Sequence, residues 1–194
     1  MAKKSKFAGI VLAGGKSSRM KTDKALLEIN GQSMLARKVA LLESLGAEKI
    51  VVSRNENDFV SDLVLEKGPM GGIYSALESL KKDKDIQFVL VVPIDMPLLD
   101  KSLLEEILHA GLAMQCPTYF EGHQLPLFLP INDDIKKLVK RIALSDSDRS
   151  IKRLLNFATS DRIVTDQLGK LVNTNDPVQW QAALTQLTNT GDLN

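Results

Sequence analysis

The stretch that decides the fold runs Phe7-Ala8-Gly9-Ile10-Val11-Leu12-Ala13, and Gly14-Gly15 follows it directly. Its apolar residues are unbroken, which is typical of a strand covered by helices on both faces, and the glycine pair ends it. We therefore expect the first and central strand of a sheet here. The basic leader before it and the short apolar run match neither a signal peptide nor a membrane span.

Two further β-rich runs follow, at residues 49–53 and 88–92. Apolar residues recur at helical spacing in 34–45, where Ser33 is suited to cap a helix, and again in 71–80. This alternation predicts an α/β fold with a doubly wound, mostly parallel, Rossmann-like sheet flanked by helices. Such sheets bind ligands outside the carboxyl ends of their strands, so the loops that follow the three strands are the expected site.

The second half of the chain has a looser pattern, with no repeat or Pro/Ser-rich linker to mark a second domain. We expect one domain over 1–188 and a frayed tail at 189–194. The expected elements are helices at 101–111, 133–144 and 150–157, a hairpin-like turn at 121–123 between apolar pieces 112–118 and 125–129, a strand at 162–164, and a last helix from Pro177 to about Leu187.

Composition limits the function classes. The 194 residues carry 25 basic and 24 acidic side chains, a formal net charge of +1, so no global field favours nucleic acid or an anionic membrane. Cys116 is the single cysteine, which excludes an intramolecular disulfide and a cysteine-based zinc site and favours a cytoplasmic location. His109 and His123 form no acid/base pair, and we expect ordinary surface roles for both.

A loop dense in glycine and cations follows the first strand, at residues 14–24. Glycines let backbone N–H groups approach an anion, and Arg19 and Lys24 can neutralise a triphosphate and the charge on a leaving pyrophosphate. The spacing is not that of a Walker A motif, because Ile10 stands where glycine is needed, and it also lacks the third glycine of GxGxxG. The loop predicts phosphate binding; the alternative is a solvated turn with incidental lysines.

An acidic residue follows the third strand. Asp95 lies between Pro93 and Pro97, which restrict the backbone and orient the carboxylate. One carboxylate with phosphate oxygens and waters is a usual way to hold Mg²⁺, so Asp95 is the predicted metal ligand. An equal alternative from this strand alone is that Asp95 caps the next helix or forms a turn, but the glycine-cation loop on a neighbouring strand end favours the metal.

A second cluster of small residues, Gly68-Pro69-Met70-Gly71-Gly72, precedes a predicted helix. Small residues there would admit a flat base and let backbone groups contact its edge. The alternative is a tight loop that closes on itself.

These motifs, in this order, resemble the molybdenum cofactor guanylyltransferase family, the MobA-like nucleotidyltransferases. The resemblance lies in residues 12–20 with Asp23-Lys24, in the 68–72 loop, and in Pro93-Ile94-Asp95-Met96-Pro97. Each motif also occurs in nucleotidyltransferases that activate sugars. The later Asn173-Thr174-Asn175-Asp176-Pro177 is similar to a pattern specific to the molybdopterin group, and together the motifs span most of the chain.

The resemblance implies individual roles. The implied catalytic residues are Lys24 and Arg19, beside the triphosphate, and Asp95, which would hold Mg²⁺. The implied nucleotide contacts are Leu12, Ala13, Gly14, Gly15, Lys24, Ser53, Glu66, Gly68 and Asp95. The implied molybdopterin contacts are Gln124, Arg149, Asn173 and Asn175.

The sequence also departs from the family pattern. Lys21 stands where glycine usually follows Arg-Met, and Ser53 stands where asparagine often follows the second strand. Ser53, Arg54 and Asn55 therefore remain alternatives for one nucleotide contact. The family's Q-P-L strand is similar to Gln124-Leu125-Pro126-Leu127, which has one residue inserted.

The implied activity is transfer of GMP from GTP to the terminal phosphate of molybdopterin, with release of pyrophosphate and Mg²⁺ as cofactor. The nucleotide half would be about 7–100 and the acceptor half about 101–188. The implied partners are GTP, molybdopterin, and molybdoenzymes or their chaperones; a monomer is expected, with no nucleic-acid or membrane partner. The resemblance favours guanine because related cytidylyltransferases carry Leu-Ala-Ala-Gly in place of Leu12-Ala13-Gly14-Gly15 and a different second loop.

Two rival functions remain. A cytidylyl- or sugar-phosphate nucleotidyltransferase would share the fold and differ in its preferred triphosphate and acceptor. A noncatalytic carrier of the finished cofactor is a different class, and the presence of Lys24 and Asp95 argues against it.

Overall fold

The computed structural model describes residues 6–14, 23–55, 59–61 and 68–190. Its strands are β1 (Lys6–Leu12), β2 (Glu28–Ile29), β3 (Gln32–Ser33), β4 (Lys49–Ser53), β5 (Ile86–Pro93), β6 (Thr118–Phe120), β7 (His123–Pro130) and β8 (Asp161–Ile163). Its helices are α1 (Met34–Ser44), α2 (Gly68–Ser79), α3 (Lys101–Met114), α4 (Asp133–Ala143), α5 (Ile151–Phe157) and α6 (Pro177–Thr190), with short 3₁₀ turns η1 (Lys24–Leu26) and η2 (Leu168–Leu171).

The main sheet has six strands in the order β4-β1-β5-β7-β6-β8. β1 pairs in parallel with both β4 and β5, and β6 pairs in parallel with β8, whereas β7 runs antiparallel to both of its neighbours. The prediction of a mostly parallel sheet is confirmed. The carboxyl ends of β4, β1 and β5 lie next to one another, so the loops that follow them meet at one edge of the sheet.

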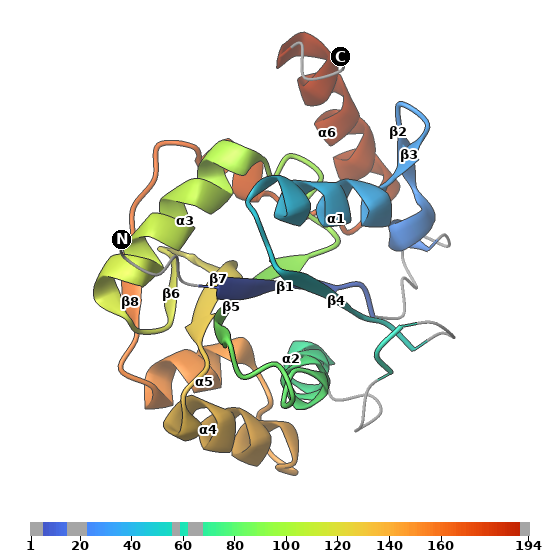
Figure 1. Cartoon of the computed structure of the whole chain (residues 1–194). Coiled ribbons are helices and arrows are strands. Elements are labelled where there is room, and N and C mark those ends of the chain that lie inside the picture. The colour runs from blue at the N-terminus through green and yellow to red at the C-terminus, as the bar shows by residue number, and fades with distance from the viewer. Residues whose placement is uncertain (1–5, 15–22, 56–58, 62–67, 191–194) are drawn as a thin grey trace.

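Helices cover both faces of this sheet (Figure 1). α1, α3 and α6 lie on one face, and α2, α4 and α5 lie on the other. The side chains of β1 alternate between the two cores: Phe7 and Val11 pack in the first, and Ile10 and Leu12 pack in the second. Because both faces are buried, every position of β1 can be apolar, and the sequence shows no hydrophobic alternation.

Several element boundaries differ from the sequence prediction. α2 begins at Gly68 rather than residue 71, and α3 continues through residues 112–114, which were expected to be an apolar piece outside the helix. α6 extends to Thr190, past the expected end at about 187. Within the described ranges, no helix combines the length and apolar character that crossing a bilayer requires.

A small hairpin of β2 and β3 precedes α1, and the sequence analysis predicts no strand there. Asn30 and Gly31 form its turn, with φ values of 54° and 73°. An Asn-Gly pair with two positive φ angles is the preferred two-residue hairpin turn, so the sequence did carry a signal for it. The hairpin leads into α1, whose first turn is capped by the Ser33 hydroxyl accepting from the Ala36 amide at 3.2 Å, as predicted.

The packing of α3 on β7 depends on Gly111. A Cβ atom at this position would lie 2.2 Å from Cγ of the buried Phe128 ring. We expect Gly111→Ala to lower the free energy of unfolding by about 1–3 kcal/mol, because overpacking outweighs alanine's better helix propensity. Urea denaturation measures the change, with the exposed Ala113→Ser in the same helix as a control that should stay within about 0.5 kcal/mol of wild type. An equally stable Gly111→Ala protein would contradict this helix-sheet contact.

Candidate active site

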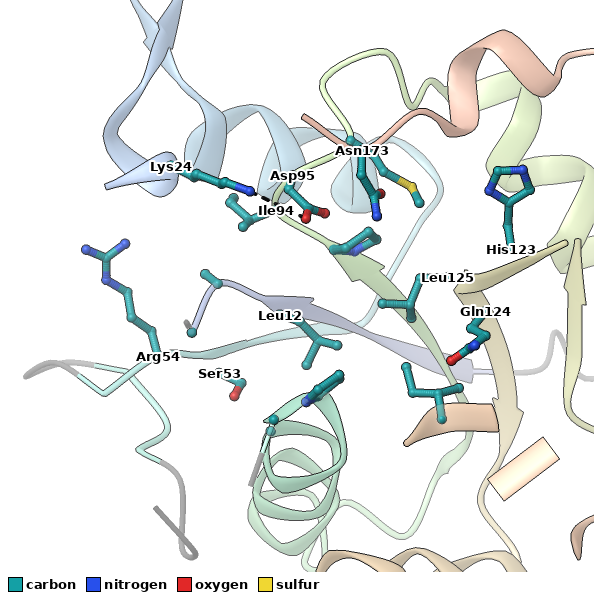
Figure 2. Close-up of a pocket in the computed structure, with 18 of the residues that line it drawn as sticks. Leu12, Lys24, Ser53, Arg54, Ile94, Asp95, His123, Gln124, Leu125 and Asn173 are labelled. Atoms are coloured by element: carbon teal, nitrogen blue, oxygen red, sulfur yellow. Dashed lines mark ion pairs between the residues drawn. The ribbon is translucent and has the colours of Figure 1, made fainter. Parts of the chain in front are cut away.

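A pocket of about 1070 Å³ lies at the sheet edge where β1, β4 and β5 end. Figure 2 shows it between the strand ends, the start of α2 and the segment that carries Asn173. Its lining residues come from both halves of the chain: Leu12, Ala13, Gly14, Asp23, Lys24, Ser53, Arg54, Asn55, Gly68, Pro69, Gly72, Pro93, Ile94, Asp95, Met96, Gly122, His123, Gln124, Leu125, Ile151 and Asn173.

The ends of β1 and β4 form one wall of the pocket. The Ala13 amide donates to the Ser53 carbonyl at 3.0 Å, which continues the parallel pairing one residue past the end of β1. Gly72 of α2 packs directly on this wall, because a Cβ there would lie 2.5 Å from the Ser53 Oγ. The glycine lets the first turn of α2 approach the strand ends, so the N–H end of the helix dipole faces the same cavity.

Lys24 and Asp95 lie next to each other in the pocket wall. The Lys24 Nζ lies 3.7 Å from the Asp95 carboxylate, and it donates a hydrogen bond of 2.9 Å to the Asn175 side-chain oxygen. Figure 2 shows the Lys24 side chain reaching toward Asp95. The two side chains are 14% and 23% exposed, so both are shielded and still reachable from the cavity. Lys24, which lies soon after the first strand, thus contacts Asn175, 151 positions later in the chain.

The turn that carries Asp95 is anchored by backbone hydrogen bonds. The Ile94 amide donates to the Leu12 carbonyl at 3.1 Å, and the Asp95 carbonyl accepts from the Thr174 amide at 2.8 Å and its hydroxyl at 3.2 Å. Asp100 caps the following helix α3, through the Leu103 amide at 3.0 Å. The alternative that Asp95 caps this helix is therefore wrong, and its carboxylate faces the cavity.

An ion pair links the end of the glycine loop to β4. The carboxylate of Asp23 accepts from the guanidinium of Arg54, and it also caps η1 by accepting from the Ala25 amide at 2.9 Å. Arg54 is 5% exposed yet lines the pocket, and Ser53 and Asn55 line it too. All three alternatives for the second-strand contact therefore border the cavity.

The far end of the pocket is built from the second half of the chain. His123, Gln124 and Leu125 begin β7 there, opposite Asn173 (Figure 2). The sequence prediction gave His123 an ordinary surface role, whereas the structure places it, half-buried, in the pocket wall. Its position directly after the predicted turn was the available signal, but a lone histidine does not specify a site.

Most predicted site residues in the described part of the chain are brought together. Leu12, Ala13, Gly14, Lys24, Ser53, Gly68, Asp95, Gln124 and Asn173 line the cavity, and Asn175 contacts Lys24. Arg149 does not line it: its guanidinium bonds to the Ser145 carbonyl and lies 3.6 Å from Asp146. Gly15, Arg19 and Glu66 lie outside the described residues.

One residue near the site was missed entirely. Lys38 of α1 is 2% exposed, and its Nζ donates to the carbonyl of Met96, the residue after Asp95. Burial, with the positive charge of Arg37, lowers the pKa of Lys38 to about 7, while nearby carboxylates including Asp95 act in the opposite direction. The sequence did signal it: Lys38 stands one turn from Met34 and one from Leu42, both buried, on the same helix face.

The donor set of the pocket fits a hydrated divalent cation. Among the described residues, no group of three or more His, Cys, Asp or Glu side chains is placed to hold a metal by itself. Asp95 offers one carboxylate beside a cavity large enough for a nucleotide, which suits a cation such as Mg²⁺ that keeps waters and takes substrate phosphate oxygens.

Comparison with known proteins finds relatives whose descriptions name one family. The family model described as MobA-like NTP transferase domain matches residues 9–163. A molybdenum cofactor guanylyltransferase from Xanthomonas euvesicatoria pv. vesicatoria is 36% identical over 179 residues, covering 90% of this chain and 92% of that protein. A probable molybdenum cofactor guanylyltransferase from Thermococcus sibiricus is 27% identical, covering 95% and 94%.

A solved structure supports the same architecture. The molybdopterin-guanine dinucleotide biosynthesis protein A from Archaeoglobus fulgidus superposes with a TM-score of 0.72, covering 94% of this chain and 100% of that chain. The sequence identity is 19%, so this likeness shows the shared fold.

Proposed function

We propose a reaction for this chain from the premise that it belongs to the MobA-like NTP transferase family. The chain is a nucleotidyltransferase of molybdenum cofactor biosynthesis. It transfers GMP from GTP to the terminal phosphate of molybdopterin and releases pyrophosphate. The observation that carries the proposal is one pocket lined by Lys24 and Asp95 from the nucleotide half and by Asn173 from the acceptor half, with Lys24 also bonded to Asn175.

The two ends of the pocket suit two substrates. GTP occupies the end formed by residues 12–14, 53–55 and the start of α2, where backbone N–H groups and the helix dipole favour phosphate. Molybdopterin occupies the end formed by Gln124 and Asn173. Asn175, which bonds to Lys24, is the proposed contact nearest to the triphosphate. Arg149 stays a proposed acceptor contact only if the acceptor reaches beyond the cavity. The reacting atoms then meet near Asp95.

The chemistry is an in-line displacement. A terminal phosphate oxygen of molybdopterin attacks the α-phosphorus of GTP, a new P–O bond forms, and the bond from the α-phosphorus to the bridging oxygen breaks. Pyrophosphate leaves with that electron pair, and no covalent enzyme intermediate is needed. Lys24 stabilises the charge that builds on the phosphates, and Arg19 is proposed to assist it. To do so, Lys24 exchanges its contacts with Asp95 and Asn175 for phosphate oxygens.

Asp95 is the proposed Mg²⁺ ligand. The bound cation would supply neutralisation of phosphate charge. Asp95 contributes an oriented carboxylate, because the backbone of its turn is bonded to β1 and to Thr174. We place the reaction in the cytoplasm, with a monomer as the working unit and molybdoenzymes or their chaperones as recipients of the product.

A thermal-shift panel tests the nucleotide assignment. With Mg²⁺ present, GTP at a hundredfold its Kd is expected to raise the Tm by about 5–10 °C, whereas ATP, CTP and UTP at the same concentration shift it far less. The GTP shift should shrink in Asp95→Ala. Selectivity for CTP or UTP would favour the rival nucleotidyltransferases, and no shift with any nucleotide would favour the noncatalytic carrier. A GTP-selective shift leads to a pyrophosphate-release assay with molybdopterin as acceptor.

A further inference from the structure

Lys38 is a buried lysine that the proposed chemistry does not use. It lies on the core-facing side of α1 between Met34 and Leu42 and does not line the pocket. Burying an ammonium costs several kcal/mol that a methionine or leucine of similar size would not. Lysine at this position therefore calls for a function that an apolar side chain cannot supply.

The partner of Lys38 is the turn that carries Asp95. Its Nζ donates to the Met96 carbonyl, 58 positions away in the chain. The same carbonyl accepts from the Leu99 amide at 3.3 Å, while the preceding carbonyl, that of Asp95, is held by Thr174. Two successive carbonyls are thus fixed by elements from different parts of the chain, with α1 on one and the segment before α6 on the other.

We propose that Lys38 is a positioning residue, which holds the Asp95–Met96 turn through the Met96 carbonyl and so fixes the direction of the Asp95 carboxylate. The part of this inference that concerns the metal rests on the proposed function; the part that concerns the turn does not. The hydrogen bond persists whether Lys38 is an ammonium or a neutral amine, since both carry an N–H donor. Outer partners of this kind orient metal ligands, and their loss weakens metal binding.

The first test uses the ligand-free protein. Lys38→Met keeps the length of the side chain and removes the donor and the charge, so we expect an unchanged or higher Tm. The Leu99 and Thr174 amide protons, which bond to the Met96 and Asp95 carbonyls, should nevertheless exchange about tenfold faster. Leu42→Met, one turn along the same helix face, is the matched control and should leave both amides at wild-type rates.

The exchange experiment can overturn the inference in two ways. Wild-type exchange at Leu99 and Thr174 in Lys38→Met would show that the turn holds without Lys38. A lower Tm with faster exchange throughout the protein would show an ordinary packing role. Lys38→Arg, which keeps N–H donors, should keep the slow exchange of the wild type. Lys38→Leu, which also removes the donor and the charge, substitutes for Lys38→Met if that variant does not fold.

The second test measures metal binding without turnover. Mn²⁺ is titrated by electron paramagnetic resonance into protein saturated with a nonhydrolysable GTP analogue. We expect the Mn²⁺ Kd to rise about tenfold in Lys38→Met and to stay at the wild-type value in Leu42→Met. Equal Kd values in wild type and Lys38→Met would overturn the role in metal binding. Failure of the wild type to bind Mn²⁺ with the analogue would instead count against the proposed function, and the exchange result would still decide the role in the turn.

Discussion

Replacing Asp95 with alanine is expected to lower kcat/KM for guanylyl transfer by about 1,000-fold, the scale on which loss of oriented charge stabilisation at a phosphate slows catalysis. Asp95 lines the cavity, and its carboxylate lies 3.7 Å from the Lys24 Nζ. The other described acidic residue in the lining, Asp23, is engaged by Arg54. Among the described residues that line the cavity, no other carboxylate is therefore available to replace Asp95 as a metal ligand.

The same substitution should leave the fold intact. The hydrogen bonds that anchor the turn use the Ile94 amide and the Asp95 carbonyl, both of which alanine at position 95 retains. A partly exposed ion pair contributes at most about 1 kcal/mol, so the Tm should change by only a few degrees.

Asp100→Asn is the matched control for Asp95→Ala. Asp100 lies five positions on, outside the cavity, and caps α3, a role in which asparagine is equally effective. Pyrophosphate release with GTP and molybdopterin should stay near the wild-type rate in Asp100→Asn. Comparable activity in Asp95→Ala would remove Asp95 from the mechanism, and an equal loss in both variants would point to the local fold.

Lys24→Ala is expected to lower kcat by about 100- to 1,000-fold, because the ammonium is a preorganised charge beside the reacting phosphates. Its present contacts are with Asp95, which lines the pocket, and with Asn175, so the proposed mechanism places it near both substrates. The loss should fall mainly on kcat if Lys24 acts on the charge of the leaving pyrophosphate, and mainly on KM if it only helps GTP to bind. Steady-state kinetics of pyrophosphate release separates the two.

Lys49→Ala is the control for Lys24→Ala. Lys49 lies at the start of β4, at the end of the sheet opposite the pocket, and its ion pair with Asp83 is solvent-exposed. Removing it subtracts the same charge from the protein, so unchanged kinetics would assign the effect in Lys24→Ala to position and not to net charge. A Lys24→Ala protein with wild-type kcat and KM would remove the lysine from the mechanism.

The central strands were predictable because burial on both faces makes them apolar throughout. The bounds of β4 agree with the prediction, and β1 and β5 differ from it only at their ends. The prediction ended the helix at Gly111, where the hydrophobic pattern becomes looser. In the structure Gly111 lies inside α3, and the Phe128 ring leaves no room for a larger side chain there. This requirement for glycine comes from a tertiary contact, which leaves no local signal in the sequence.

The site was predictable in part. That the loops after β1, β4 and β5 meet follows from parallel topology, and this brought Gly14, Ser53 and Asp95 together from pattern alone. The contact of Asn175 with Lys24 has no such basis, since spacing cannot relate residues 151 positions apart, and only the family resemblance suggested that Asn175 belongs to the site. Arg149 shows the limit of that resemblance, because it lies outside the cavity lining.

The late position of Thr174 and Asn175 in the chain has a consequence for synthesis on the ribosome. All six strands of the main sheet end by Ile163, so a chain that stops between residues 164 and 173 already contains every strand of that sheet. The contacts to Asp95 and Lys24 must wait for residues 174 and 175. Premature termination between these points would therefore leave every strand of the sheet but remove the segment that bonds to Asp95 and Lys24.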